Sequence, residues 1–400
     1  MRPVAMAFRG VRERRVSSII TILAVALACS LLMLVWAFKK EAEQSFARAN
    51  GGFDAVLGPR GSKLQIVLNA LYHLDESPGL MKWKDFEQVA KYPAIEAAYP
   101  IAVGDNYRGY RLVGTVSDYL SKHSYAEDRH FEIEEGGALF EEKSMNAVVG
   151  NLVARRLGMK VGDTFHPYHG LIYNESAKHE EIYTVTGILK PTGTPADKVI
   201  WIPISGIQTM SGHDPSAATD ISAALLKFKQ GANMAGFQLD MLYNKQGNRL
   251  TLAWPANRTI IQFFDKISWF DKILQAVAAL VAIIAGGSIL AILHNAMNER
   301  KRDIAVLRAL GAKRFTVFTI SLLEAVGMTL AGVVAGFVVY LVLGFSIGEV
   351  VQRETGVLLS PFTYNSAMIW APMGMLGIGV FSGLLPSLKA YRTDVSKNLS

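Results

Sequence analysis

The sequence predicts an α-helical membrane protein with four transmembrane helices and a large α+β extracytoplasmic domain inserted between helices 1 and 2. Half of the 400 residues are hydrophobic and the mean hydropathy is +0.23, which is above the usual range of soluble proteins. Four windows are long and apolar enough to cross a hydrocarbon core of about 30 Å. The stretch between the first two windows has ordinary polar content and no window of spanning length.

The spans and the residues between them divide the chain into nine predicted segments. In order, these are a cytoplasmic N-terminal segment (1–15), the first transmembrane helix (16–38), an extracytoplasmic α+β domain with a helical stalk (39–269), the second transmembrane helix (270–293), a cytoplasmic coupling helix (294–315), the third transmembrane helix (316–347), a short extracytoplasmic loop (348–366), the fourth transmembrane helix (367–388) and a cytoplasmic tail (389–400).

The orientation follows from the basic residues of the short segments. Segments 1–15, 294–315 and 389–400 together hold fourteen Lys and Arg residues against four acidic residues, which leaves 27 basic and 30 acidic residues elsewhere. We therefore expect both termini and segment 294–315 on the cytoplasmic side of the membrane and the large domain on the outer side. The pI of about 9.3 then reflects topology, and no nucleic-acid partner is expected.

The single cysteine, Cys29, lies in the first span, so the outer domain has no disulfide. The run "AVALACS" around it loosely imitates a lipoprotein signal, which makes a signal peptide the alternative interpretation. The apolar run continues beyond the cysteine through "SLLMLVWAF", and this favours a transmembrane helix.

The outer domain alternates strand-like and helix-like pieces. Strands are expected in "FDAVLG", "YRLVGTV", "NAVVG", "EIYTVTGIL", "KVIWIPI" and "SAALLKFKQG", and helices in the segments after "GPRGS", in "MKWKDFEQVAKYP", in "NLVARRLG" and in "ANMAGFQLDMLYNKQGN". From residue 257 to 298 there is no proline and apolar residues recur at threes and fours. This predicts one helix that runs from the domain through the second span.

No catalytic motif is recognisable. The sequence contains no G-x-x-x-x-G-K-[ST], G-x-S-x-G, H-E-x-x-H or C-x-x-C. The chain is therefore expected to be a non-catalytic subunit without a cofactor of its own.

One loop of the outer domain is rich in metal-binding residue types. "HPYHGLIYNESAKHEE" brings together His166, His169, His179, Glu180 and Glu181. Imidazoles and carboxylates are ligands of Zn²⁺. The alternative is a polar hairpin with scattered histidines, since His166 and His169 flank a proline in a loop.

The predicted transmembrane helices contain one carboxylate and two pairs of glycines that are candidates for a functional or packing role. Glu324 lies inside the third span, where a carboxylate faces the bundle interior or a polar partner. It marks either a proton or substrate path or a structural role near the inner interface, in which it pairs with a base such as Lys313 or Arg314 or with a backbone donor. Two G-x-x-x-G pairs favour close helix packing within the bundle or across a dimer, namely Gly332 with Gly336 and Gly379 with Gly383.

The segment "ILHNAMNERKRDIAVLRALGAKRFTVFTISLLEAVGMTLAGVVAGFVVY" resembles the permease core of the MacB/FtsX-type (type VII) ABC transporters. The E-R-x-[RK]-[ED]-I-x-x-[LM]-[RK]-A-[LIV]-G-A pattern of that family is matched by Glu299, Arg300, Arg302, Asp303, Ile304, Leu307, Arg308, Ala309, Leu310, Gly311 and Ala312. An L-x-E-A-like run follows at Leu323, Glu324 and Ala325. The C-terminal residues Pro386, Ala390, Asp394, Val395 and Leu399 are similar to the family ending but lack its proline after Asp394.

The resemblance implies a permease that is not fused to its ATPase, with a layout like the lipoprotein-releasing permeases. It also implies a multi-pass protein of the bacterial inner membrane, with the large domain in the periplasm and both termini in the cytoplasm. Its expected partners are two copies of an ABC ATP-binding subunit that binds ATP and Mg²⁺, a second permease copy that forms a homodimer, a periplasmic or membrane-fusion protein, and the lipid bilayer. The residues expected to couple to the ATPase are Glu299, Arg300, Arg302, Asp303, Leu307, Arg308 and Gly311.

The function expected on this basis is ATP-driven movement of the periplasmic domain, or mechanotransmission, that exports or extracts a substrate from outside the cytoplasm. Two alternatives stay open. One is a regulatory scaffold of the FtsX type that activates a cell-wall hydrolase. The other is a zinc-linked transport system that uses His166, His169 and His179.

Overall fold

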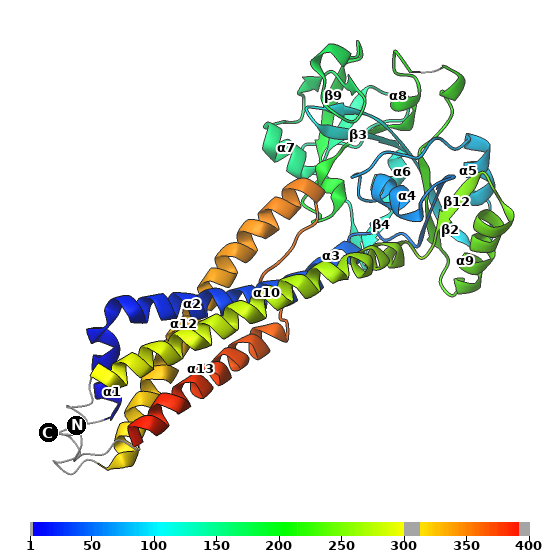
Figure 1. The fold of residues 1–400 in the computed structure, drawn as a ribbon. Coiled ribbons are helices and arrows are strands. Elements are labelled where there is room, and N and C mark those ends of the chain that lie inside the picture. Colours follow the sequence, from blue (N-terminus) through cyan, green and yellow to red (C-terminus); the bar gives the residue numbers. More distant parts are fainter. Residues whose placement is uncertain (1–2, 214, 300–312, 392–400) are drawn as a thin grey trace. The chain divides into compact units, whose positions relative to one another are not determined.

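The computed structural model describes residues 3–213, 215–299 and 313–391 (Figure 1). The chain divides into two compact units, which are described separately. The helical unit comprises Met1–Glu41, Ile267–Ile347 and Ser360–Ser400, and the α+β unit comprises Ala42–Lys266 and Gly348–Leu359.

Among the described residues, four helical stretches are long and apolar enough to span a membrane: Arg15–Arg48, Ala256–Glu299, Arg314–Thr355 and Ala367–Leu388. The elements that form them are α2 (Arg15–Met33), the π-helical η1 (Leu34–Phe38), α3 (Lys39–Arg48), α10 (Ala256–Glu299), α12 (Arg314–Thr355) and α13 (Ala367–Tyr391), and the short α1 (Pro3–Glu13) precedes them. The prediction of four apolar helices is confirmed.

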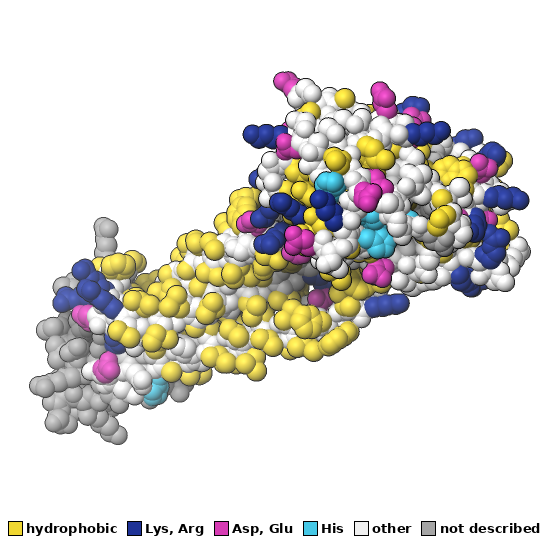
Figure 2. Space-filling view, turned by 90° about the horizontal axis from the view of Figure 1, so that it is seen from above, with side chains coloured by type: hydrophobic (Ala, Val, Ile, Leu, Met, Phe, Trp, Pro, Cys, Tyr) yellow, Lys and Arg dark blue, Asp and Glu magenta, His cyan; other side chains and the backbone are white. Residues whose placement is uncertain are grey.

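The helical unit carries large apolar side chains on its outside. Leu23 on α2, Leu280 on α10 and Val334 on α12 are each more than half exposed. Figure 2 shows hydrophobic side chains gathered over the helices of this unit. Because such a surface is unfavourable in water, it fits a hydrocarbon environment.

Small residues lie where the helices of this unit approach closest. The glycines of the two G-x-x-x-G pairs lie at such contacts. A Cβ atom built on any of these four glycines would come within about 3 Å of a neighbouring helix, a distance that real Cβ contacts rarely reach. The four contacts are Gly332 with Val25, Gly336 with Cys29, Gly379 with Thr329, and Gly383 with Ala325.

The α+β unit is built on a ten-stranded mixed sheet with the order β12-β1-β11-β2-β3-β10-β6-β9-β7, and β8 pairs with β2 beside this path. The strands are β1 (Ala55–Pro59), β2 (Ile95–Tyr107), β3 (Tyr110–Thr115), β6 (Asn146–Val149), β7 (Thr164–Phe165), β8 (Tyr168–His169), β9 (Tyr183–Ile188), β10 (Ile200–Pro203), β11 (Ala223–Phe228) and β12 (Leu250–Ala253), while β4 (Ser124–Ala126) and β5 (Arg129–His130) form a separate hairpin.

Short helices accompany the sheet. They are α4 (Lys63–Ala70), α5 (Trp83–Ala90), α6 (Ser117–Lys122), α7 (Asn151–Leu157), η2 (Glu175–Ala177), η3 (Pro195–Lys198), α8 (Ile204–Gln208), η4 (Pro215–Ala217), α9 (Asn233–Asp240) and the π-helical η5 (Met241–Gln246). Apolar side chains from both sheet and helices form the core, including the fully buried Leu112, Tyr183 and Ile202. Every strand-like and helix-like piece that the sequence analysis quoted for this domain forms an element of the expected kind.

Two helices are longer than their membrane spans. α10 is unbroken from Ala256 to Glu299, as the lack of proline predicted. α12 continues to Thr355, so residues 348–355 are helical although the sequence analysis placed them in a loop. No proline occurs between Arg314 and Pro361, and the residues after the span are compatible with further helical turns.

Candidate metal centre

A buried carboxylate forms the centre of the candidate site. Asp105 lies near the end of β2, and its side chain is completely buried. The register between β2 and β3 shifts between Val103 and Asp105, so that Gly104 forms a β-bulge. A bulge redirects the side chains that follow it, and here it precedes the one acidic residue of the strand's second half.

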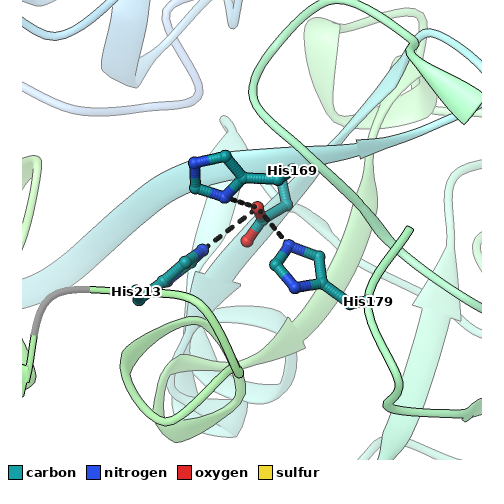
Figure 3. Close-up of side chains that lie close together, drawn as sticks. His169, His179 and His213 are labelled. Carbon is teal, nitrogen blue, oxygen red and sulfur yellow. Dashed lines mark hydrogen bonds and ion pairs between the residues drawn. The ribbon is translucent and has the colours of Figure 1, made fainter. Parts of the chain in front are cut away.

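Three imidazoles surround one oxygen of this carboxylate (Figure 3). The distances to Asp105 Oδ1 are 3.4 Å from His169 Nδ1, 3.1 Å from His179 Nε2 and 3.2 Å from His213 Nε2. One ligand atom from each of the four residues lies within 4.8 Å of the others. The side chain of His179 is buried and that of His213 nearly so, whereas that of His169 is 56% exposed.

His169 and His179 reach Asp105 through local pairing of the segment between them. β8 pairs antiparallel with β2, and His169 stands directly opposite Asp105. Tyr168 forms a bridge with Lys178, and the amide of His179 donates to the carbonyl of Pro167 at 2.9 Å. This pairing brings His179 back next to His169, although the two are ten positions apart in the sequence.

Asn106 fastens β8 to β2. Its side chain is buried, and its Nδ2 donates to the carbonyl of Gly170 at 2.9 Å and to that of Tyr168 at 3.3 Å. These two bonds flank His169, so they fix the backbone that presents its imidazole to Asp105.

Glu181 fastens the turn that carries His213. Its carboxylate accepts hydrogen bonds from the amide of Ser211 at 2.7 Å and from Ser211 Oγ at 2.9 Å. Burial acts to raise the pKa of Glu181, but the hydrogen bonds from Ser211 outweigh it and the pKa is lowered. The charged form of Glu181 therefore links the turn to the start of β9.

The hydrogen bond of His213 Nδ1 determines which ring nitrogen faces Asp105. Nδ1 lies 2.8 Å from the carbonyl oxygen of Ile207, which can only accept, so Nδ1 carries a hydrogen and Nε2 faces Asp105. The hydrogen bond with Asp105 raises the pKa of His213, although partial burial opposes this.

The structure brings together two of the three histidines that the sequence analysis named. His169 and His179 contact Asp105, while His166 turns its Nδ1 to the backbone carbonyl of His179 at 3.2 Å. Sequence reasoning missed Asp105 and His213. An aspartate in an otherwise strand-like run, "IAVGDNY", was a usable signal, because a charge on a buried strand needs a partner. Nothing in "SGHDP" marks His213.

The structure describes Glu324, the polar residue predicted inside the third span, but only one of the residues predicted to couple to the ATPase. Glu324 is buried in the helical unit and has an interaction partner. Glu299 ends α10, and its Oε2 pairs with Arg14 Nε at 3.2 Å, while Arg14 also donates to the carbonyl of Ala296. The other coupling residues, Arg300, Arg302, Asp303, Leu307, Arg308 and Gly311, lie outside the described residues.

Comparison with known families gives two matches in this chain. Residues 17–241 match the family described as MacB-like periplasmic core domain, and residues 276–395 match the FtsX-like permease C-terminal family. The first match covers more than half of the chain. Residues 1–16, 242–275 and 396–400 lie outside both matches.

Several curated proteins are similar over most of the chain. The pyoverdine export ATP-binding/permease protein PvdT of Pseudomonas syringae pv. tomato is 25% identical over 363 residues, which cover 84% of this chain and 52% of that protein. The macrolide export ATP-binding/permease protein MacB of Vibrio parahaemolyticus is 23% identical over 73% of this chain and 41% of that protein. This chain thus spans about half the length of the curated relatives it matches first.

A relative of similar length and a solved structure also match. The ABC transporter permease YvrN of Bacillus subtilis is 22% identical over 414 residues, which cover 97% of each chain. The crystal structure of the periplasmic region of MacB from Actinobacillus actinomycetemcomitans has a TM-score of 0.36 at 13% identity and covers 55% of this chain and 95% of that one.

Proposed function

We propose a coupling function for this chain, which belongs to the family of MacB-like and FtsX-like ABC transporter permeases. ATP hydrolysis by a separate ATPase subunit would drive movement of its α+β unit. The movement would drive export or extraction of a substrate on the outer side of the membrane. Relatives named for pyoverdine and macrolide export support the export direction.

The observation that carries the proposal is the continuity of α10. This helix has 44 residues, of which 256–266 belong to the α+β unit and 267–299 to the helical unit. An unbroken helix transmits displacement along its axis unless it bends or breaks. A push at its Glu299 end is therefore carried to residues of the α+β unit.

The Glu299 end of α10 is anchored and leads into the charged segment 299–312. The pair of Glu299 with Arg14 ties this end to the start of α2. The charged residues that follow in the sequence, Arg300, Arg302, Asp303 and Arg308, are the ones expected to contact an ATPase. The excess of basic residues around this segment supports a cytoplasmic location for it and for both termini, in a bacterial inner membrane.

The assembly proposed is a permease dimer with two ATPase subunits that bind ATP and Mg²⁺. The permease itself performs no chemistry in this scheme. Its contribution is the mechanical link between hydrolysis on one side of the membrane and the α+β unit on the other.

The test is reconstitution of the chain in lipid nanodiscs with the ATPase encoded beside its gene. Charge reversal at Arg302 and Arg308 is expected to weaken ATPase association and to reduce permease-stimulated hydrolysis at least about tenfold, because two docking charges become repulsive. Charge reversal at Lys190, an exposed residue of the α+β unit, is the control and should change neither.

Two results would overturn the proposal. One is unchanged association and hydrolysis in the Arg302 and Arg308 variants. The other is specific recovery of a peptidoglycan hydrolase by the full chain together with hydrolase activation, which would favour the regulatory scaffold instead.

A further inference from the structure

We propose that Asp105, His169, His179 and His213 bind one divalent transition-metal ion of the Zn²⁺ class in the α+β unit. This inference stands on the geometry of the four side chains and is independent of the proposed coupling function. Three imidazole nitrogens and one carboxylate oxygen form a donor set that Zn²⁺ takes in proteins.

The spacing of the four groups fits a tetrahedral ion. With metal–ligand distances of about 2.0–2.2 Å, two ligands of a tetrahedral Zn²⁺ lie about 3.3 Å apart. The three imidazole nitrogens lie 3.1, 3.2 and 3.4 Å from Asp105 Oδ1. The remaining separations between ligand atoms do not exceed 4.8 Å, and side-chain rotations can close that difference.

The carboxylate shows a polar atom that the protein does not satisfy. Asp105 is fully buried, and its Oδ2 has no hydrogen-bond partner. A buried charged oxygen without a partner is strongly unfavourable. A cation beside Oδ1 supplies the missing compensation for the whole carboxylate, directly to one oxygen and electrostatically to the other.

The ring of His213 is arranged as a metal ligand. Its Nδ1 hydrogen is donated to the carbonyl of Ile207, so Nε2 is the nitrogen that faces Asp105 Oδ1. Metal-bound histidines commonly donate their second nitrogen to a backbone carbonyl in this way, which fixes the tautomer. A metal ion between Nε2 and Oδ1 would take both atoms as ligands in place of the hydrogen bond that now joins them.

The three rings converge on one point. Their centroids lie 5.1 to 5.5 Å apart, around a single carboxylate. One divalent ion at that point can contact a nitrogen of each ring and the carboxylate oxygen at the same time.

The site is open to solvent on one side, and hydrogen bonds hold the segments that carry its histidines. Because the side chain of His169 is 56% exposed, an ion can exchange with solvent by movement of this one ligand. Asn106 and Glu181 hold the two segments that supply the histidines. Metal binding thus joins β2, the segment 166–179 and the turn after α8, and is expected to order this face of the α+β unit.

The experiment uses the untagged full chain in detergent after removal of metal by a chelator. Titration with Zn²⁺ against a chromophoric chelator should give one ion per chain at sub-micromolar affinity. Titration with Co²⁺ should produce the intense visible bands of a tetrahedral complex. Bound Zn²⁺ should slow hydrogen exchange in peptides that cover residues 166–181 and 205–213.

His169→Ala is the main variant, because the exposed side chain can be removed without disturbing the core. It should weaken Zn²⁺ binding by at least about 100-fold, since loss of a ligand exceeds the usual effect of a supporting residue. Asp105→Asn should do the same and also abolish the Co²⁺ bands. His130→Ala and Asp118→Asn remove an exposed histidine and an exposed aspartate elsewhere in the unit, and should leave binding unchanged.

Absence of saturable one-to-one binding to the full chain would overturn the inference. Binding by His169→Ala that equals that of the unsubstituted chain would overturn it as well. Neither result would bear on ATPase coupling, because no ATPase is present in the titration.

Discussion

Histidines occupy two opposite environments within the α+β unit. His169, His179 and His213 surround a carboxylate, and hydrogen bonding to it raises the pKa of His213. His73 and His123 lie among apolar and aromatic groups, and burial lowers the pKa of His73 to about 3 and that of His123 to about 4. Residue type alone therefore does not distinguish the candidate metal ligands from the other histidines. What distinguishes them is the carboxylate of Asp105, which faces their rings.

The two buried rings serve packing. His73 meets the ring of Trp201 edge to face at 5.6 Å, and His123 stacks on Phe53 at 4.1 Å with nearly parallel planes. His123 also bonds to the carbonyl of Gly51. Burial favours the neutral imidazole at both positions, and the positive charge of Arg111 acts in the same direction on His73, so a proton at either position acts against folding.

The largest expected effect is therefore loss of stability in acid. Since the pKa of His73 is about 3 in the folded chain and 6.5 ordinarily, the unfolded state binds the proton first. The contribution is fully present above about pH 6.5 and is lost as pH falls towards 3. Between about pH 7.5 and 4.5 this one residue should lower the free energy of unfolding by about 3 kcal/mol.

His73→Asn tests this value, because asparagine tolerates the positive φ of 53° at this position and does not titrate. Urea unfolding of the α+β unit in the full chain, followed by tryptophan fluorescence, should show a smaller acid effect in the variant. His130→Asn is the matched control and should keep the full effect. An equal acid effect in His73→Asn and the unsubstituted chain would show that His73 is not held neutral.

Sequence patterns were sufficient for most of the fold because the relevant signals are local. The unbroken α10 follows from apolar spacing and the absence of proline between residues 257 and 298. The G-x-x-x-G pairs are visible as short spacings, and each of their glycines lies at a close helix contact. The extension of α12 to Thr355 was missed because the end of an apolar window is not the end of a helix.

The metal site could be predicted only in part, because half of it is assembled by tertiary structure. His169 and His179 come from one loop and were visible as a histidine-rich segment. His213 is 108 residues from Asp105 and reaches it only because α8 follows β10 in the sheet that also contains β2. No spacing in a single segment encodes that approach.

A smaller effect is expected at the residue that positions His213. Glu181→Ala removes both hydrogen bonds to Ser211 and frees the turn, while all four proposed ligands remain. Zn²⁺ affinity should fall by about tenfold, the usual effect of a supporting residue. The measurement is the chelator competition titration, together with the thermal midpoint of the metal-free chain.

Glu180→Ala is the control for that variant, since Glu180 is the exposed neighbour on the same segment. It should leave the affinity unchanged. If Glu181→Ala lowers the metal-free midpoint strongly and leaves the affinity intact, Glu181 supports the fold and does not position His213.

The smallest effect is expected at His166, and it separates spacing in the sequence from geometry in the fold. His166 belongs to the same histidine-rich loop as His169 and His179, but its Nδ1 meets a backbone carbonyl 3.2 Å away and it is absent from the group around Asp105. His166→Ala should therefore change Zn²⁺ affinity by less than about threefold, because only one neutral hydrogen bond is lost. The Co²⁺ spectrum should stay as in the unsubstituted chain. A loss as large as that of His169→Ala would mean that the ion is held by neighbours in the loop, and the contrast between the carboxylate-centred histidines and the rest would no longer explain which ones bind metal.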